Sequence, residues 1–173
     1  MKKDHWILIV FLLTFILSII FSTISNVIAV SCNNIVLFIV LVVTISFGIL
    51  FDVIGTAAIT ANEATFHALN SKKIKGAKQG IVLIKNSNKI SSVCNDIVGD
   101  ICGIISGSIG AILAISFSLT TGLSNTLVSV ILAAFISAFT VGGKAIFKVV
   151  AINNADNIIL TVSKVISIFG GNK

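Results

Sequence analysis

Four long apolar stretches constrain this sequence more than any other feature. They are His5–Val30, Ile35–Ala61, Ile97–Leu119 and Thr126–Ile152. Each can form a helix that crosses a hydrocarbon core of ~30 Å, which takes about 20 apolar residues. The sequence is 56% hydrophobic and only 10% charged, too little polar surface for a soluble domain. We therefore predict an all-α integral membrane protein with about four transmembrane helices.

The lysines predict how these helices are oriented. Lys2 and Lys3 precede the first span, and the next lysines, Lys72 to Lys89, lie between the second and third spans. Lys148, Lys164 and Lys173 lie at or beyond the end of the fourth, whereas the loops "SCNN" and "TTGLSN" contain no lysine. Because lysine-rich segments stay on the cytoplasmic side, we predict a multi-pass protein of the cell membrane with both termini cytoplasmic.

The N-terminal span, residues 1–31, has two interpretations. "MKK" followed by an apolar run resembles a signal peptide, but the run is longer than the usual apolar core of about 7–15 residues. An uncleaved span is favoured. Cleavage would leave three spans in the same orientation, with an external N-terminus.

Two segments are predicted to lie along the membrane surface. Asn62–Ser91, between the second and third spans, carries apolar side chains among its lysines, as an amphipathic helix does. Asn157–Phe169 is too short to span, and residues 157–173 are predicted to form an interfacial helix and tail. The lipid bilayer is the expected partner of both. A nucleic acid is not, since arginines and aromatic stacking platforms are absent from the lysine-rich segment.

Four ionisable residues within or beside the spans are candidate site residues. They are Asp52, Asp96, Asp100 and Lys144. With a helical rise of ~1.5 Å per residue, Asp52 and Lys144 lie roughly 25 and 27 Å from the external ends of their spans. Asp100 lies a turn or two inside the cytoplasmic boundary of the third span. Charges inside a bilayer are costly and tend to pair or to line a pathway, so their similar depth predicts a polar site.

The third span also carries a glycine stripe. Gly99, Gly103 and Gly107 recur every four residues, which predicts a face where another helix packs closely. The pattern alone indicates only helix packing. Its place beside Asp100 leaves open a tighter bundle that encloses a small cation site.

From the second span onward, residues 35–156, the sequence resembles the transmembrane domain of the CorB/CorC (cyclin-M) family of magnesium and cobalt transporters. "LFDVIGTAAITANEATFHALNSKKIKGAK" resembles the end of the family's first core span and its amphipathic juxtamembrane helix, and "GKAIFKVVAINNAD" resembles the end of its last span. The matching positions include Thr56, Ala57, Asn62, Leu69, Gly76, Ala77, Lys78, Gly143, Lys148, Ala151, Asn154, Ala155 and Asp156. The resemblance covers about 120 residues. It implies a homodimer formed through the spans.

The sequence departs from the family pattern at the cation site. Asp52 stands where the family has a serine, Gly55 and Lys144 each stand where it has a glutamate, and Phe147 replaces a proline. Either Asn95–Asp96 or Gly99–Asp100 corresponds to the family's asparagine region. The sequence ends at Lys173 without the family's cytoplasmic regulatory domains.

These residues lead to two hypotheses of different classes. In the first, the protein binds or transports a divalent cation, magnesium or cobalt, through oxygens of Asp52, Asn95, Asp96 and Asp100, because magnesium prefers carboxylate and other hard oxygen ligands. In the second, it is a non-transporting scaffold or accessory subunit, with a membrane or cytoplasmic partner, in which Lys144 occupies the cation site. Lys144 decides between them: it either pairs with Asp52 or Asp100, or extends to the cytoplasmic surface and leaves the aspartates to a metal ion.

Other classes fit less well. A holin-like membrane-perturbing protein would fit the size and the lysines but not the charges at matched depth. An enzyme is not expected, because no nucleophile–base pair and no His/Cys ligand cluster occurs. No organic cofactor is expected either.

Overall fold

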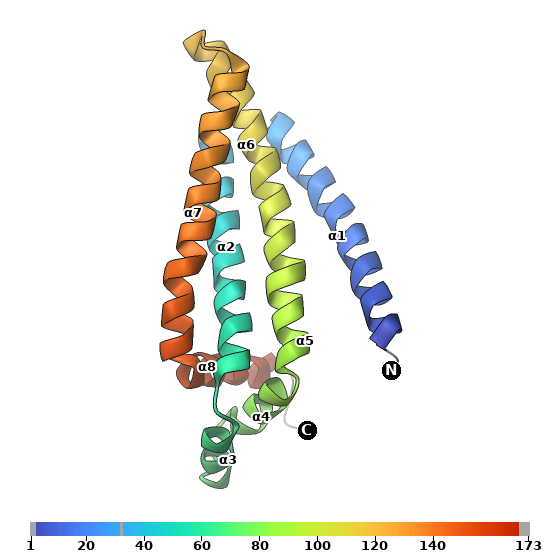
Figure 1. Cartoon of the computed structure of the whole chain (residues 1–173), viewed down its shortest axis with the longest axis vertical. Coiled ribbons are helices and arrows are strands. Elements are labelled where there is room, and N and C mark those ends of the chain that lie inside the picture. Colours follow the sequence, from blue (N-terminus) through green and yellow to red (C-terminus); the bar gives the residue numbers. More distant parts are fainter. Residues whose placement is uncertain (1–2, 32, 170–173) are drawn as a thin grey trace. The chain divides into compact units, whose positions relative to one another are not determined.

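The structure, a computed structural model, describes residues 3–31 and 33–169, and these ranges consist of helices joined by short turns, with no strand. Figure 1 shows the helices in chain order. They are α1 (Lys3–Ser31), α2 (Asn34–Thr60), α3 (Glu63–Ser71), α4 (Ala77–Lys85), α5 (Ser87–Ser91), the π-helix η1 (Ser92–Val98), α6 (Gly99–Thr121), α7 (Asn125–Asn153) and α8 (Ala155–Phe169). The predicted all-α class is confirmed.

Three helices within the described ranges are long and apolar enough to cross a membrane. They are α2, the continuous helical run Ser87–Thr121, and α7. In α1 the apolar stretch among the described side chains is Phe11–Ser25, which is shorter than a span. A fourth, N-terminal span therefore stays a prediction.

The helix that contains the third span begins earlier than expected. Its sequence predicts an apolar span from Ile97, whereas the helix already begins at Ser87 and passes through the π-helix Ser92–Val98. The polar residues Ser87, Asn88 and Lys89 add turns before the apolar run. Hydropathy marks where a helix enters hydrocarbon, not where the helix itself begins, and this accounts for the difference.

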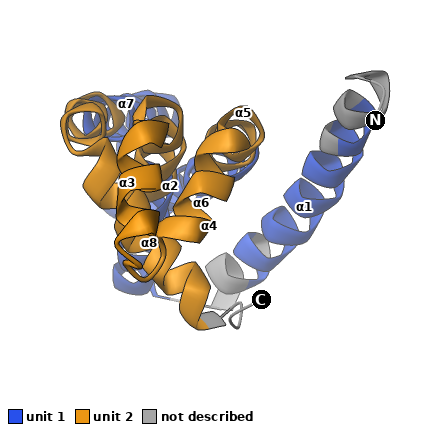
Figure 2. Ribbon diagram, turned by 90° about the horizontal axis from the view of Figure 1, so that it is seen from below, with its two compact units in different colours: residues 1–49, 97–143 blue, residues 50–96, 144–173 orange. Residues whose placement is uncertain are grey.

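The chain divides into two compact units, which are coloured separately in Figure 2. Unit 1 comprises residues 1–49 and 97–143. Within it α1 packs against α6. A core of Leu37, Leu41, Ile109 and Leu113 joins α2 to α6, and Leu132 and Ile136 of α7 pack against it. Large apolar side chains on α1, α2 and α7 point outward; Phe11, Phe38 and Phe139 are 69%, 58% and 69% exposed. So much exposed apolar surface is typical of a lipid-facing protein.

Unit 2 comprises residues 50–96 and 144–173 and contains α3, α4, α5 and α8. Its core is built around the fully buried Phe66, with small side chains such as Ala57 and Ala155 and the buried Ile159 of α8. Both α3 and α8 pack against α4. The segment Asn62–Ser91, predicted as one or two amphipathic helices, thus forms three short helices that share a core with α8 and the end of α2.

Every lysine after Lys3 belongs to unit 2. This unit therefore carries the positive charge that the sequence assigns to the cytoplasmic side of the membrane. The only acidic residue of unit 1 beyond Asp4 is Asp100.

Candidate functional site

An ion pair joins two of the predicted site residues in unit 2. Lys144 Nζ of α7 lies 4.0 Å from Asp52 Oδ1 of α2. Both side chains are largely shielded, with exposed fractions of 29% for Lys144 and 16% for Asp52. At 4.0 Å the contact is electrostatic and is too long for a direct hydrogen bond. Of the two arrangements open to Lys144, the structure places it beside a carboxylate within the chain.

Asn95 forms the second polar feature of the site, within the π-helix. Its Nδ2 donates to Ser91 Oγ at 3.2 Å. Its Oδ1 is buried and accepts no hydrogen bond from any of the residues that the structure describes. A buried acceptor without a partner is rare in proteins and costs about 1–3 kcal/mol. π-Helical turns within α-helices are frequently found at functional positions, where the extra residue redirects side chains.

Gly55 allows Asn95 to approach α2. A Cβ placed on Gly55 would overlap Asn95 Oδ1 and would lie 3.2 Å from Cys94 Cβ. A larger residue at position 55 would therefore force the Asn95 side chain to move. Gly55 follows Asp52 by three residues, so both lie on one face of α2. The amide oxygen of Asn95 is thus directed at the helix face that also carries the Asp52–Lys144 pair.

The two other predicted ligands are exposed. Asp96 belongs to the π-helix in unit 2, and Asp100 to the first turn of α6 in unit 1. Neither carboxylate forms an ion pair among the described residues. In the same part of the chain, no three His, Cys, Asp or Glu side chains come together in a group that could hold a metal ion. The set predicted from sequence, Asp52, Asn95, Asp96 and Asp100, does not form such a carboxylate cluster.

The three glycines of the predicted stripe do not share the same surroundings. Gly99 is buried. A Cβ placed on Gly103 or Gly107 would meet nothing within 4 Å. These two glycines line a hollow of about 360 Å³ between α6 and α7, together with small residues such as Ser129 and Ala133. The described residues leave the space beside them unfilled, and close packing by another helix stays a prediction.

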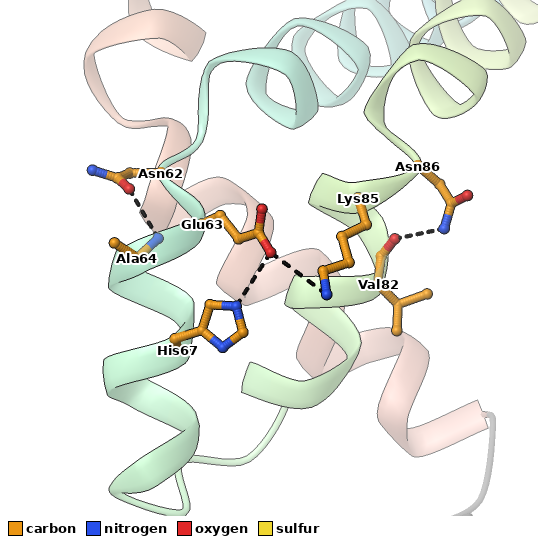
Figure 3. Close-up of polar contacts among 7 residues, drawn as sticks. All are labelled: Asn62, Glu63, Ala64, His67, Val82, Lys85 and Asn86. Atoms are coloured by element: carbon orange, nitrogen blue, oxygen red, sulfur yellow. Dashed lines mark hydrogen bonds and ion pairs between the residues drawn. The ribbon is translucent and has the colours of Figure 1, made fainter.

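A third polar cluster lies on the surface of α3 and α4 (Figure 3). Glu63 Oε1 contacts His67 Nε2 at 3.2 Å and Lys85 Nζ at 3.7 Å. Asn62 caps α3 by accepting a hydrogen bond from the Ala64 amide at 2.9 Å. These contacts are exposed, and the Glu63–Lys85 pair connects α3 to α4. Such surface pairs contribute little more than local order.

Sequence reasoning did not identify one long-range contact of unit 2. The Asn62 backbone amide donates to Asp156 Oδ1 at 2.8 Å, which ties the end of α2 to the start of α8. Asn62 and Asp156 are 94 residues apart, and no local pattern connects them. The only available signal was that both match positions typical of the CorB/CorC family.

The described residues define an all-helical class of protein, with three helices among them that are long and apolar enough to span a membrane. Comparison with models of known families, with curated proteins and with solved structures gives no match. The resemblance to the CorB/CorC family therefore stays a prediction from the residues quoted above.

Proposed function

We propose that this protein is a small multi-pass membrane protein that does not transport cations, and that Lys144 takes the place of a cation beside Asp52. The observation that carries the proposal is the 4.0 Å contact between Lys144 Nζ and Asp52 Oδ1. An ammonium tethered to α7 neutralises the carboxylate of α2 and holds the two helices together. On this view the protein acts as a scaffold or accessory subunit in the cell membrane, with both termini cytoplasmic.

Electrostatics supports this interpretation. Two unit charges 4 Å apart interact by about 4 kcal/mol at an effective dielectric near 20. The same magnitude acts as repulsion between the Lys144 ammonium and each charge of a divalent ion that would enter beside it. A magnesium ion at Asp52 would therefore have to displace Lys144 first.

The second candidate is binding or transport of a divalent cation, with magnesium or cobalt as cargo. One observation favours it: the buried Asn95 Oδ1 has no hydrogen-bond partner and is a hard oxygen ligand of the kind magnesium prefers. Asp52 is three residues from Gly55, which Asn95 contacts. If Lys144 swung toward the cytoplasmic surface, Asp52 and Asn95 would supply two oxygens, and Asp96 of the same unit a further one.

A magnesium flux assay distinguishes the two functions. It uses liposomes that contain the purified protein in the membrane and a magnesium-sensitive dye inside. We expect no flux above that of empty liposomes from the wild type. The Asp100→Asn and Asp52→Asn variants, reconstituted in equal amounts, serve as controls. Flux by the wild type that both variants abolish would overturn the non-transporting proposal and establish the second candidate. The same liposomes, probed with protease on either side, test the proposed orientation.

A homodimer formed through the spans is part of this proposal. Its support is the resemblance to the CorB/CorC family together with the unfilled space beside Gly103 and Gly107. No nucleic acid and no organic cofactor take part in it.

A further inference from the structure

Lysines are concentrated where the turn between α3 and α4 meets α8. Lys72, Lys73, Lys75 and Lys78 occur within seven consecutive residues, and all four are exposed. Lys164 of α8 joins them because α8 crosses this turn: a Cβ on Gly76 would lie 2.9 Å from the Lys164 backbone nitrogen and 3.1 Å from its Cγ. We name these five residues the basic surface.

Gly76 makes this juxtaposition possible. Its φ of 88° is left-handed, which suits glycine, and its lack of a side chain lets the α8 backbone approach the turn. The Lys164 side chain therefore starts directly over the turn between Lys75 and Lys78. The fold thus brings together lysines that are almost 90 residues apart in sequence.

Apolar groups lie next to the basic surface. Lys78, Gln79, Val82, Leu83 and Ile166 line a hollow of about 200 Å³ between α4 and α8. Val82 and Ile166 are 56% and 41% exposed. A surface with ammonium groups beside exposed aliphatic side chains matches the boundary between lipid headgroups and acyl chains.

Three acidic residues of unit 2 make their contacts away from these lysines. Glu63 is occupied by His67 and Lys85. Asp156 accepts the Asn62 amide, and Asp52 pairs with Lys144. None of these three contacts involves Lys72, Lys73, Lys75 or Lys164, so a partner of opposite charge is expected at these four lysines.

We propose that the basic surface and the adjoining hollow bind anionic phospholipids of the bilayer that the spans cross. The phosphate groups would contact the lysines, and the upper part of an acyl chain would lie against Val82 and Ile166. The inference rests on the proposed membrane location alone and is independent of whether Lys144 excludes a cation. A nucleic acid fits less well, because Phe66, the one Phe, Tyr or Trp side chain of α3 and α4, is fully buried and offers no stacking platform.

The test measures phospholipid retention by the full-length protein. The protein is purified in non-ionic detergent, mixed with equal amounts of phosphatidylglycerol and phosphatidylcholine, and analysed by native mass spectrometry. We expect the wild type to retain phosphatidylglycerol preferentially. Each lysine near an anionic surface contributes about 1 kcal/mol to the binding free energy. In the triple variant Lys73→Gln, Lys75→Gln, Lys164→Gln, the preference for phosphatidylglycerol should therefore be at least about tenfold lower than in the wild type.

A matched variant controls for overall charge. This triple variant carries Lys85→Gln, Lys89→Gln and Lys148→Gln. It also loses three positive charges but keeps the basic surface intact, and it should keep the preference for phosphatidylglycerol. Equal preference in all three proteins, or equal loss in both variants, would overturn the proposal. Circular dichroism and gel filtration verify that each variant is folded, and a variant that fails is replaced by Lys73→Gln with Lys75→Gln, which leaves α8 unchanged.

Two further measurements distinguish a phospholipid headgroup from free phosphate or a soluble polyanion as the bound group. Inorganic phosphate at millimolar concentration should not displace the bound lipid; displacement would indicate a site for free phosphate and overturn the lipid proposal. Val82→Asn should weaken phosphatidylglycerol retention without changing the charge. A different result would assign the surface to a soluble polyanion instead. In that case Val82→Asn would leave phosphatidylglycerol retention unchanged, and an acidic peptide or an oligonucleotide would be retained as well as the lipid.

Discussion

Lys144 Nζ lies 4.0 Å from Asp52 Oδ1, and this contact joins α7 to α2 through two charges that have little access to water. In the predicted resemblance to the CorB/CorC family, Lys144 replaces a carboxylate and Asp52 replaces a serine. Considered singly, each exchange adds a charge to a long apolar helix. Considered together, the two charges cancel, which is how ionisable groups within spans are generally accommodated.

The first prediction concerns the energetics of this pair. Asp52→Asn or Lys144→Met should each lower the free energy of unfolding by about 1–3 kcal/mol, because each leaves a shielded charge without its partner. The double variant should recover most of that loss and lie within about 1 kcal/mol of the wild type. Unfolding in mixed detergent micelles, followed by circular dichroism, measures all four proteins. Additive losses in the double variant would show that the two charges do not interact.

The second prediction concerns the contact between Gly55 and Asn95. Gly55→Ala should destabilise the protein by about 1–3 kcal/mol, since the added methyl group overlaps the Asn95 side chain. Gly142→Ala is the matched control: it also lies within a long helix, but its Cβ would meet nothing within 4 Å. Alanine has the higher helix propensity, so the control should be neutral or slightly stabilised. The same unfolding assay compares them.

Rescue of Gly55→Ala identifies the residue responsible. Adding Asn95→Ala removes the overlapping atoms and the unpartnered Oδ1 together, so the double variant should regain most of the lost stability. If Asn95→Ala fails to rescue, the obstruction at Gly55 arises from Cys94 instead, whose Cβ would lie 3.2 Å from the added methyl group.

The sequence was sufficient to predict the helices but not all of their limits. The predicted spans Ile35–Ala61 and Thr126–Ile152 agree with α2 and α7 to within one residue at each end. Both are bounded by polar turns, so hydropathy and helix limits coincide. At the third span they do not coincide, since the helix continues through polar residues back to Ser87.

The site was less accessible to sequence reasoning, for a physical reason. Depth within a span follows from counting residues, and it indicated correctly that Asp52 and Lys144 lie at a similar level. Which side chains face each other depends on helix rotation, which depth does not determine. The unpartnered Asn95 Oδ1 and the glycine contacts at Gly55 and Gly76 depend on that rotation, and the sequence offered no signal for them.

The third prediction tests the turn between α3 and α4. Gly76 and Gly122 both have positive φ, of 88° and 71°, so replacement by alanine strains either backbone by about 1 kcal/mol. At Gly76 the new methyl group would in addition lie 2.9 Å from the backbone nitrogen of Lys164. At Gly122 it would meet nothing within 4 Å. Gly76→Ala should therefore cost about 1–2 kcal/mol more than Gly122→Ala in thermal or detergent unfolding. Equal losses would mean that α8 does not pack on this turn.

The last prediction concerns self-association through the hollow between α6 and α7. Gly107 lines this hollow, and a Cβ there meets nothing within 4 Å, so Gly107→Ile should leave the isolated chain folded. A branched side chain would nevertheless keep a second helix from packing closely. We expect this variant to lower dimer formation in liposomes by about tenfold, measured by energy transfer between labelled copies. Ile131→Phe is the control, since Ile131 is 55% exposed on α7 but lies outside the hollow. Unchanged energy transfer in Gly107→Ile, or an equal loss in both variants, would exclude the hollow as the dimer contact.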